Sequence, residues 1–509
     1  MLSFSAQTRA ANLARMADDR FDVLVIGGGI TGVGVALDAA ARGLSVALVE
    51  KDDFASGTSG RSSRLIHGGI RYLEHGDFGL VHEALRERKI LLRLAPHLVR
   101  PVPMYLLAPS SRARAQFGIG LTSYDLLAAG RNIGVHHRVT AQQVRDAVPG
   151  FGGDSGGYRY FECQTDDARL TVEVVRTAHA FGAVLANHAE VTVLLGDGRV
   201  TGAAVTDTLT GEPLEVRARV TVNATGVWAD QVSGLAGADA GSGGQRLRPS
   251  KGIHLVFAPG AIQATAAFVV PSSAHDGRSV FLVPWEDRVY AGTTDTPYAG
   301  DLDNPTVEAA DQQYILAAVA RYFPAVTERD VVASWAGLRP LLAGAEARET
   351  AASEDLSRRH AVFEGPAGLY TISGGKLTTY RAMAEDLVDR IAAEIEPAGR
   401  CRTRSIPLGL HGSLDEAQTL ARAEAARLGL PTSIADRLVQ RYGDDWRQAV
   451  RMIDAEPSLG APVVDGLPVL KVEMELARSR EMAVTDEDVF VRRTRLTTRD
   501  ASVRLPVTG

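Results

Sequence analysis

The segment Phe21-Asp22-Val23-Leu24-Val25-Ile26-Gly27-Gly28-Gly29-Ile30-Thr31-Gly32 joins a short apolar run to a cluster of glycines. An alanine-rich stretch follows over 33–42, then Gly43 and a second apolar run over 45–50. A short apolar run that stops at glycine is typical of a buried parallel strand. Gly43 lies where a helix needs a left-handed terminal residue. The pattern therefore predicts a strand–helix–strand unit and a doubly wound parallel sheet.

The glycines of this turn have the spacing of a dinucleotide-binding pattern, G-x-G-x-x-G. The first glycine permits a tight turn, the second lets the backbone approach a pyrophosphate, and the third allows close packing of helix on strand. The helix N-terminus then offers N–H groups and partial positive charge to the pyrophosphate. An acidic residue ends the next strand, where it would accept hydrogen bonds from a ribose with a free 2′-hydroxyl. These features favour FAD or NAD over NADP, and the candidate residues are Gly27, Gly29, Ile30, Thr31, Gly32 and Glu50.

Three distant segments of the sequence distinguish FAD from NAD as the cofactor. The stretch 51–63 is rich in hydroxyls and glycine, and such a stretch can donate hydrogen bonds along a flavin. An apolar run ends at 224–226, and 373–379 opens a helix whose dipole would favour negative charge on a flavin. One dinucleotide turn supported by separate segments indicates a flavoprotein, and therefore FAD. The further candidate FAD contacts are Thr58, Ser59, Ser62, Ser63, Ala224, Thr225, Gly226, Gly375, Lys376 and Leu377.

Positively charged residues lie beside glycines near the same segments. The loop that follows the flavin stretch carries His67, Arg71 and Tyr72, and glycine-flanked turns further along carry Arg339 and Lys376. Arginine binds phosphate in bidentate fashion and lysine acts as a point charge, so the three cations together would suit a dianionic phosphate. Taken alone, each cation is equally compatible with a solvated surface charge.

Two histidines are candidates for the base of an alcohol oxidation. His67 could remove a hydroxyl proton as hydride leaves the adjacent carbon, although a hydrogen-bonded structural histidine at the flavin edge would look the same. His254 is the alternative base, and Asp295 is expected to orient a substrate-site group or to fix its loop. No histidine has metal-ligand spacing to another histidine or to a cysteine, so no metal is predicted.

The composition excludes other classes of protein. The chain has 509 residues, with 55 Lys+Arg against 61 Asp+Glu and a net charge of −6, so it lacks the basic surplus that nucleic-acid binding requires. Its length suggests about three domains. Two well-separated cysteines, Cys163 and Cys401, indicate a reducing compartment. Neither a signal peptide nor a membrane span is expected, and the predicted location is cytoplasmic, with peripheral membrane attachment open.

The motifs together resemble the FAD-dependent glycerol-3-phosphate dehydrogenase family, within the D-amino-acid-oxidase-like flavoproteins. The resemblance rests on residues 62–75, 284–285, 292–295 and 374–380, and on a tail over 480–494 like the family's helical C-terminal domain. It implies oxidation of sn-glycerol 3-phosphate to dihydroxyacetone phosphate by hydride transfer to FAD, with electrons then passed to a membrane quinone. It also implies a homodimer held peripherally on the inner, cytoplasmic face of the cell membrane. The loop departs from the family at Arg64 and Ile70, where Lys and Leu are expected.

The resemblance also assigns residues and domains. The implied phosphate or substrate ligands are Arg71, Tyr72, Arg339, Lys376 and Thr379, and the catalytic candidates are His67, His254 and Arg339. The expected fold combines α/β and α+β architecture in three parts. These are a discontinuous Rossmann-type FAD-binding domain over 21–110, 170–250 and 330–400, an inserted β-sheet substrate (cap) domain over 111–169 and 251–329, and a small all-α C-terminal domain over 405–509.

Other functions use the same scaffold. A glycerol-3-phosphate oxidase would pass electrons to O2 and release H2O2 without a membrane. An amino-acid or amine oxidase would bind a substrate carboxylate, for which three clustered cations are more than is needed, and a non-enzymatic flavin-binding regulator is a third alternative. The membrane contact is equally open, because Arg112, Arg114 and Phe117 either meet anionic lipid headgroups or lie in a solvated loop.

Overall fold

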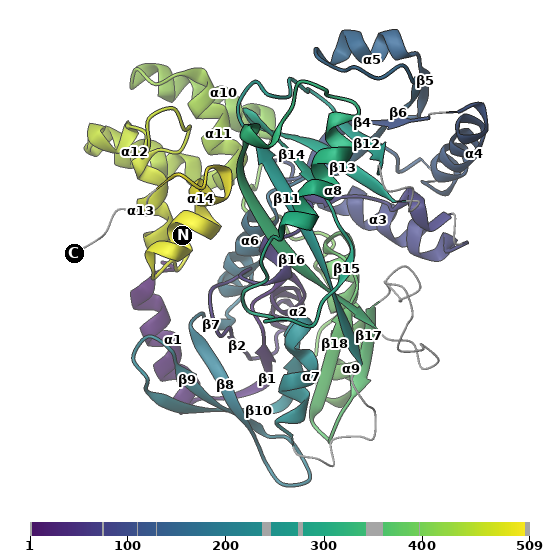
Figure 1. Ribbon diagram of the computed structural model, residues 1–509. Helices are drawn as coiled ribbons and strands as arrows, with labels where there is room; N and C mark the ends of the chain where they lie inside the picture. The colour runs from purple at the N-terminus through teal and green to yellow at the C-terminus, as the bar shows by residue number, and fades with distance from the viewer. Residues whose placement is uncertain are drawn as a thin grey trace.

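The computed structural model describes residues 3–73, 76–108, 110–128, 130–236, 246–272, 278–342, 360–395 and 398–503. Within these residues the chain forms two sheets, with a group of C-terminal helices packed beside them (Figure 1).

The first sheet is built around the apolar run that precedes the glycine turn. β1 (Arg20–Ile26) pairs in parallel with β2 (Val46–Val49) on one side and with β10 (Pro213–Asn223) on the other. The strand order is β17-β18-β10-β1-β2-β7, parallel from β18 to β7 with an antiparallel edge strand. A ladder of β8 and β9 continues from β10. The remaining strands are β7 (Val184–Ala186), β8 (Ala189–Leu195), β9 (Gly202–Asp207), β17 (His360–Glu364) and β18 (Leu369–Gly374).

A layer of helices covers one face of this sheet. α2 (Ile30–Ala41) begins directly after the glycine turn, and it contacts α6 (Asp167–Ala180) and α9 (Tyr380–Glu394). Gly43 follows α2 with φ +92°, the left-handed conformation that favours glycine. The predicted strand–helix–strand unit is therefore confirmed.

The second sheet is mixed. β12 pairs in parallel with β4, and the other strand pairs of this sheet are antiparallel. Its order is β15-β11-β14-β13-β12-β4-β6-β3, with β16 paired to β11 and β5 to β6. The strands are β3 (Leu65–Ile66), β4 (Arg100–Leu107), β5 (His137–Val139), β6 (Gly157–Gln164), β11 (Leu247–Phe257), β12 (Ala267–Pro271), β13 (Ser279–Trp285), β14 (Arg288–Gly292), β15 (Thr296–Pro297) and β16 (Val331–Leu342).

The predicted domain limits at 110 and 330 do not coincide with the division of the strands between the two sheets. The strands β4 and β16 fall in segments that were expected to belong to the FAD-binding domain, yet they pair within the second sheet. The physical reason is register: β16 pairs with β11 along eleven residues of β11, which no local sequence pattern reveals. The chain therefore crosses between the sheets more often than the predicted boundaries assume.

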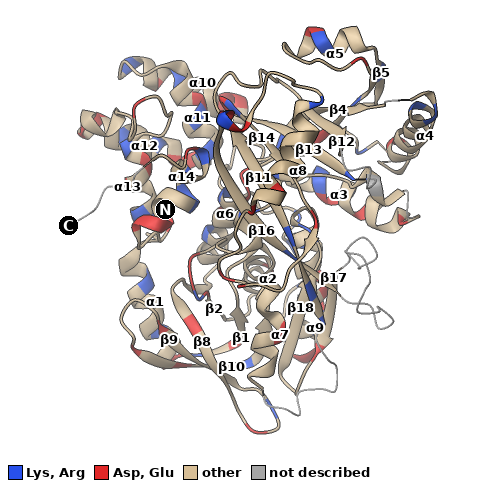
Figure 2. Cartoon of the chain, viewed as in Figure 1, with Lys and Arg blue, Asp and Glu red and all other residues tan. Residues whose placement is uncertain are grey.

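The C-terminal part is helical, as expected. Its helices are α10 (Leu414–Arg427), α11 (Thr432–Tyr442), α12 (Trp446–Ala455), α13 (Lys471–Arg480) and α14 (Leu496–Arg499), with a π-helical turn over Asp488–Arg493. Ser413 caps α10 by accepting a hydrogen bond from the backbone of Glu416. Charged positions of both signs are interspersed along these helices (Figure 2).

The other helices are α1 (Ala6–Asp18), α3 (Phe78–Leu94), α4 (Ser111–Ala128), α5 (Ala141–Ala147), α7 (Ala229–Gly234) and α8 (Ala309–Ala320). Among the described residues, none of the helices combines the length and the apolar character needed to cross a membrane.

Candidate active site

A cavity of about 320 Å³ lies at the carboxyl ends of β1 and β2, beside the N-terminus of α2. This edge is where doubly wound sheets bind dinucleotides. The predicted FAD contacts that line it are Gly27, Gly29, Ile30, Thr31, Glu50, Thr58, Ser59, Ala224, Thr225, Gly226, Gly375, Lys376 and Leu377. The distant segments that indicated a flavoprotein do converge on one cavity.

Backbone crowding explains the glycines of the turn. A Cβ on Gly32 would lie 2.0 Å from the carbonyl oxygen of Gly27, and one on Gly27 would lie 2.7 Å from that of Ala224. Gly27 also has φ +111°. Only bare backbone fits here, so the first turn of α2 can approach a pyrophosphate closely. The residues present therefore fit the dinucleotide part of FAD.

Glu50 lies in the wall of this cavity. Its carboxylate accepts hydrogen bonds from the backbone N–H groups of Gly28, at 2.6 Å, and Asp52, at 3.0 Å. Burial raises its pKa. These two backbone bonds fix the orientation of a carboxylate that can accept the hydroxyl donors of a ribose.

A second cavity of about 240 Å³ adjoins the first. The residues that line both are Ile30, Thr58, Ser59, Pro340, Gly375, Lys376 and Leu377. The second cavity alone contains the predicted residues Ser62, Ser63, His67, Tyr72, His254 and Arg339. Candidate substrate ligands and candidate bases thus share one space that opens onto the dinucleotide cavity. The side chain of Arg71 lies outside the described residues, so its predicted role stays a prediction.

Arg339 lies on β16, and its side chain is held by residues of the turn between β14 and β15. Its Nη2 donates to the Oγ1 of Thr293 at 2.9 Å, and its Nη1 donates to the Oδ1 of Asp295 at 3.3 Å. Asp295 therefore orients a group of this cavity, as expected from the sequence. On the neighbouring strand, a Cβ at Gly252 would lie 2.4 Å from the guanidinium. Because Gly252 has no side chain, the guanidinium of Arg339 can occupy this space.

Lys376 and Tyr72 form a second cationic element. The Nζ of Lys376 lies 3.5 Å from the centroid of the Tyr72 ring, within the range of a cation–π contact. Gly69 has φ +76°, and a Cβ there would lie 2.4 Å from the same ring. Lys376 and Arg339 together bring two positive charges to this cavity, which suits a dianionic group.

The two candidate bases differ in their surroundings. His67 is half-buried, and its backbone N–H donates to the Oγ1 of Thr378 at 3.2 Å. His254 is buried, its Nε2 lies 2.9 Å from the Oγ of Ser63, and its ring stacks on Trp335 with 4.6 Å between centroids. Burial, together with the nearby charge of Arg339, holds the pKa of His254 well below its usual value, so its imidazole is neutral.

Three of the predicted site residues mainly support the surrounding structure of the two cavities. Thr379 is buried and lines neither cavity, and its hydroxyl donates to the carbonyl of Lys376 at 3.4 Å. Ser62 donates its hydroxyl to Asp167 at 2.7 Å. Gly32 does not line the first cavity, but its packing against Gly27 forms the turn.

Sequence reasoning missed Trp335, and it assigned no role to Thr293 although residues 292–295 are part of the resemblance. Trp335 lies directly opposite His254 in the pairing of β11 with β16, which places the indole against the imidazole. The alternation of residues along each strand could have suggested an inward face, but only the register shows which side chains meet.

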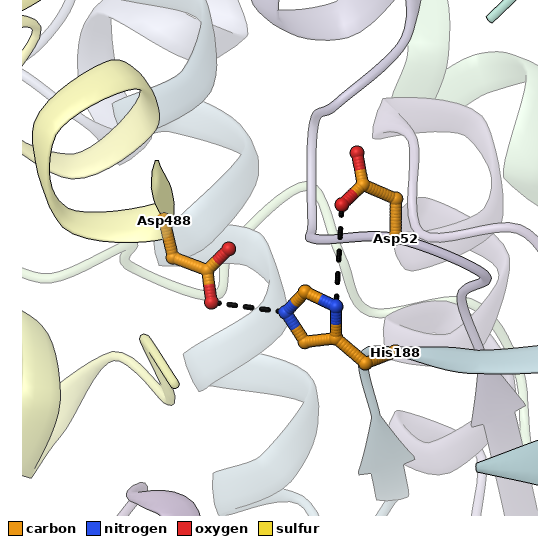
Figure 3. A group of neighbouring side chains, drawn as sticks. All are labelled: Asp52, His188 and Asp488. Atoms are coloured by element: carbon orange, nitrogen blue, oxygen red, sulfur yellow. Dashed lines mark hydrogen bonds and ion pairs between the residues drawn. The ribbon is translucent and has the colours of Figure 1, made fainter. Parts of the chain in front are cut away.

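One further group of ionisable residues lies outside both cavities. Asp52, His188 and Asp488 have potential ligand atoms within 4.8 Å of one another, and the imidazole lies between the carboxylates (Figure 3). The carboxylate of Asp488 already accepts hydrogen bonds from the N–H of Val484 at 2.8 Å and from Arg492 at 2.7 Å. With a guanidinium in contact, this is an ion-pair network that links the loop after β2 to the C-terminal helices. The absence of a metal stays a prediction.

Comparison with known proteins agrees with this site. Residues 22–390 match a family model described as FAD dependent oxidoreductase, and residues 401–507 match the C-terminal domain of alpha-glycerophosphate oxidase. A Mycobacterium tuberculosis protein named glycerol-3-phosphate dehydrogenase 2 is 40% identical over 496 residues, which cover 96% of this chain and 83% of the relative. The human mitochondrial glycerol-3-phosphate dehydrogenase is 36% identical over 512 residues, covering 96% and 69%.

A solved structure gives the same result. The glycerol-3-phosphate dehydrogenase from Bacillus halodurans, complexed with FAD, aligns with a TM-score of 0.78 and 33% identity over 98% of this chain and 90% of its own. A glycine oxidase from Bacillus cereus, at 21% identity and a TM-score of 0.55, shares the fold.

The fold and the joined cavities define an oxidoreductase of the class that uses FAD as its cofactor. Within that class the chain belongs to the FAD-dependent glycerol-3-phosphate dehydrogenase family, because the likeness extends through both the FAD-binding part and the helical C-terminal part.

Proposed function

We propose that this enzyme oxidises sn-glycerol 3-phosphate to dihydroxyacetone phosphate and passes the electrons to a membrane quinone. One observation carries the proposal: Arg339 and Lys376 line a cavity that is continuous with the dinucleotide cavity. A phosphorylated alcohol bound to these cations would have its carbon chain beside the flavin. The names of relatives at 36–40% identity support the same substrate.

The chain's own residues bind and orient the substrate. The guanidinium of Arg339, held by Thr293 and Asp295, would take two phosphate oxygens, and Lys376 would add a point charge. Such orientation can lower a barrier by about 7–11 kcal/mol at most. A histidine then accepts the proton of the C2 hydroxyl. When bound, FAD supplies the acceptor for the hydrogen and electron pair that leave C2.

We propose His67 as that base and predict that His67→Asn lowers kcat by about 10²–10⁴-fold while FAD stays bound. His67 lines the substrate cavity and is less buried than His254, so its ring can exchange a proton with solvent. Steady-state kinetics and the flavin absorption spectrum measure the two effects. His254→Asn is the matched variant. Full turnover in His67→Asn together with loss of turnover in His254→Asn would move the base role to His254.

The substrate and the acceptor need separate experiments. Anaerobic titration with glycerol 3-phosphate should bleach the flavin absorbance, whereas bleaching by an amino acid alone would establish an amino-acid oxidase. An oxygen electrode and a quinone-analogue dye assay, run side by side, distinguish the quinone-linked enzyme from the O2-using oxidase. Rapid oxygen uptake with H2O2 release would favour the oxidase.

We further propose that helix α4 faces the membrane, where a quinone would be met. Ile119 and Leu126 are 71% and 75% exposed, and together with Arg112 they repeat every seven residues, which places them on one face of the helix. Its first turns carry Arg112 and Arg114, while Asp125 is paired with His136 at 2.7 Å. Two exposed apolar side chains with a basic residue on the same helix face suit a surface rich in anionic lipid.

The double variant Ile119→Asp/Leu126→Asp should therefore weaken binding to anionic vesicles by at least about tenfold, because two apolar side chains would no longer be buried in the lipid. Cosedimentation with phosphatidylglycerol vesicles measures this effect, and dye-linked activity in solution should be unchanged. Val193→Asp, at a half-exposed position on β8, is the control. Equal vesicle binding by all three proteins would show that α4 is a solvated helix. The homodimer that the resemblance implies is tested by light scattering.

A further inference from the structure

The loop of residues 51–63, called here the flavin-facing loop, lines both cavities through Thr58 and Ser59. Its only regular element among the described residues is one 3-10 turn, Thr58–Gly60. Ala55 has φ 64°, and a Cβ on Gly60 would lie 2.3 Å from the carbonyl oxygen of Ala55. With so little secondary structure of its own, the loop depends for its position on the groups behind it.

The beginning of the loop is tied to the C-terminal domain. The carboxylate of Asp53 is fully buried, and it accepts hydrogen bonds from the Nε of Arg492 at 2.7 Å and from the Nη2 of Arg493 at 2.8 Å. Both arginines belong to the π-helical turn over Asp488–Arg493. Two guanidinium groups on one buried carboxylate form a strong, directional anchor.

The end of the loop is tied to the same domain by Arg495. Its Nη1 donates to the carbonyl of Gly60 at 2.9 Å, and its Nη2 pairs with Asp167 on α6. The other carboxylate oxygen of Asp167 accepts hydrogen bonds from the backbone N–H of Ser62 at 2.9 Å and from the Ser62 hydroxyl at 2.7 Å. Arg495 thus contacts the loop once directly and once through Asp167.

Arg495 is itself tightly placed. It is 2% exposed, it has φ 62°, and its guanidinium also donates to Asp166 at 3.3 Å. Burial alone would raise the pKa of Asp166, but the charges of Arg495 and Arg441 outweigh burial and lower that pKa. Asp166 therefore stays ionised and keeps its ion pair with Arg495 at physiological pH.

We infer that the C-terminal helical domain acts as a clamp on the flavin-facing loop, with Arg495 and Asp167 as positioning residues for the FAD site. Neither residue lines either cavity, so both act through the loop. With the clamp in place, Thr58, Ser59 and Ser62 hold fixed positions. Without it, the loop samples other positions and FAD dissociates more readily.

The test compares the holoenzyme with Arg495→Met and Asp167→Asn. Each variant should raise the FAD dissociation constant by about tenfold or more, since each removes a charged hydrogen bond that fixes the loop. Flavin fluorescence after dilution measures release. Hydrogen exchange of the amides over 54–63 should accelerate, while that of β1 should not change. Arg495→Lys, which keeps the charge, should restore part of the affinity, and the double variant should weaken binding by less than the two single effects combined.

Arg427→Met is the control, because Arg427 forms an exposed ion pair with Asp454 in the same domain, at 3.0 Å. It should leave FAD affinity and loop exchange unchanged. The inference is overturned if Arg495→Met or Asp167→Asn lowers only the unfolding temperature, with normal FAD affinity and normal exchange over 54–63. If Arg495→Met does not fold, the near-isosteric Asp167→Asn decides. Since the readout is flavin retention, a negative result leaves the proposed substrate and acceptor untouched.

Discussion

Gly32→Ala is expected to give a folded chain that is purified colourless. The new Cβ would lie 2.0 Å from the carbonyl oxygen and 3.1 Å from the carbonyl carbon of Gly27, and both atoms are backbone. No rotation of a side chain can relieve that clash, so α2 must move away from β1. The movement would displace Ile30 and Thr31, which line the first cavity. We expect FAD affinity to fall roughly 100-fold or more, equivalent to about 2.7 kcal/mol.

The measurement is the ratio of flavin to protein absorbance after gel filtration, followed by titration of the apoprotein with FAD. Gly79→Ala is the matched control, because a Cβ at Gly79 on α3 meets nothing within 4 Å. Circular dichroism checks that both variants fold. A yellow Gly32→Ala protein with ordinary affinity would show that the close approach of α2 to β1 does not hold the dinucleotide.

The dinucleotide half of the site could be predicted from the sequence because its determinants are local. Strand, glycine turn, helix and terminal acid lie within 30 residues, and each has its own backbone requirement. The structure places Gly27 and Glu50 as that pattern requires. The hydroxyl-rich stretch after Glu50 could be predicted for the same reason, since the chain continues directly from the strand end.

The surroundings of the substrate cavity could not be predicted in the same way, because they depend on long-range register. Trp335 meets His254 only because β16 and β11 pair as they do, with the two residues directly opposite. Arg495 and Asp167 are 328 positions apart, and neither segment carries a motif for the contact. Buried ion pairs have no local signature either: Arg88 on α3 is fully buried against Glu162, although the helix carries many charges.

Arg339→Ala should raise the KM for glycerol 3-phosphate by about 100-fold, with a smaller fall in kcat and no loss of FAD. The guanidinium is held within the cavity by Thr293 and Asp295. Without the guanidinium, the phosphate would lose two hydrogen bonds to a charged group. Each such hydrogen bond contributes about 1.5–3 kcal/mol. Arg339→Lys keeps the charge but loses the fork, so it should recover only part of the affinity.

Glycerol, which lacks the phosphate, shows which role Arg339 has. If the arginine binds phosphate, Arg339→Ala should lower kcat/KM for glycerol 3-phosphate far more than for glycerol, so the preference for the phosphorylated substrate collapses. If instead Arg339 acts at the reacting carbon, kcat/KM should fall by the same factor for both substrates, and the preference for glycerol 3-phosphate should be unchanged. Arg217→Ala, a change of an exposed arginine on β10, should alter neither value. A preserved preference would therefore remove Arg339 from phosphate binding and leave that role to the other cationic side chains of the cavity, Lys376 and Arg61.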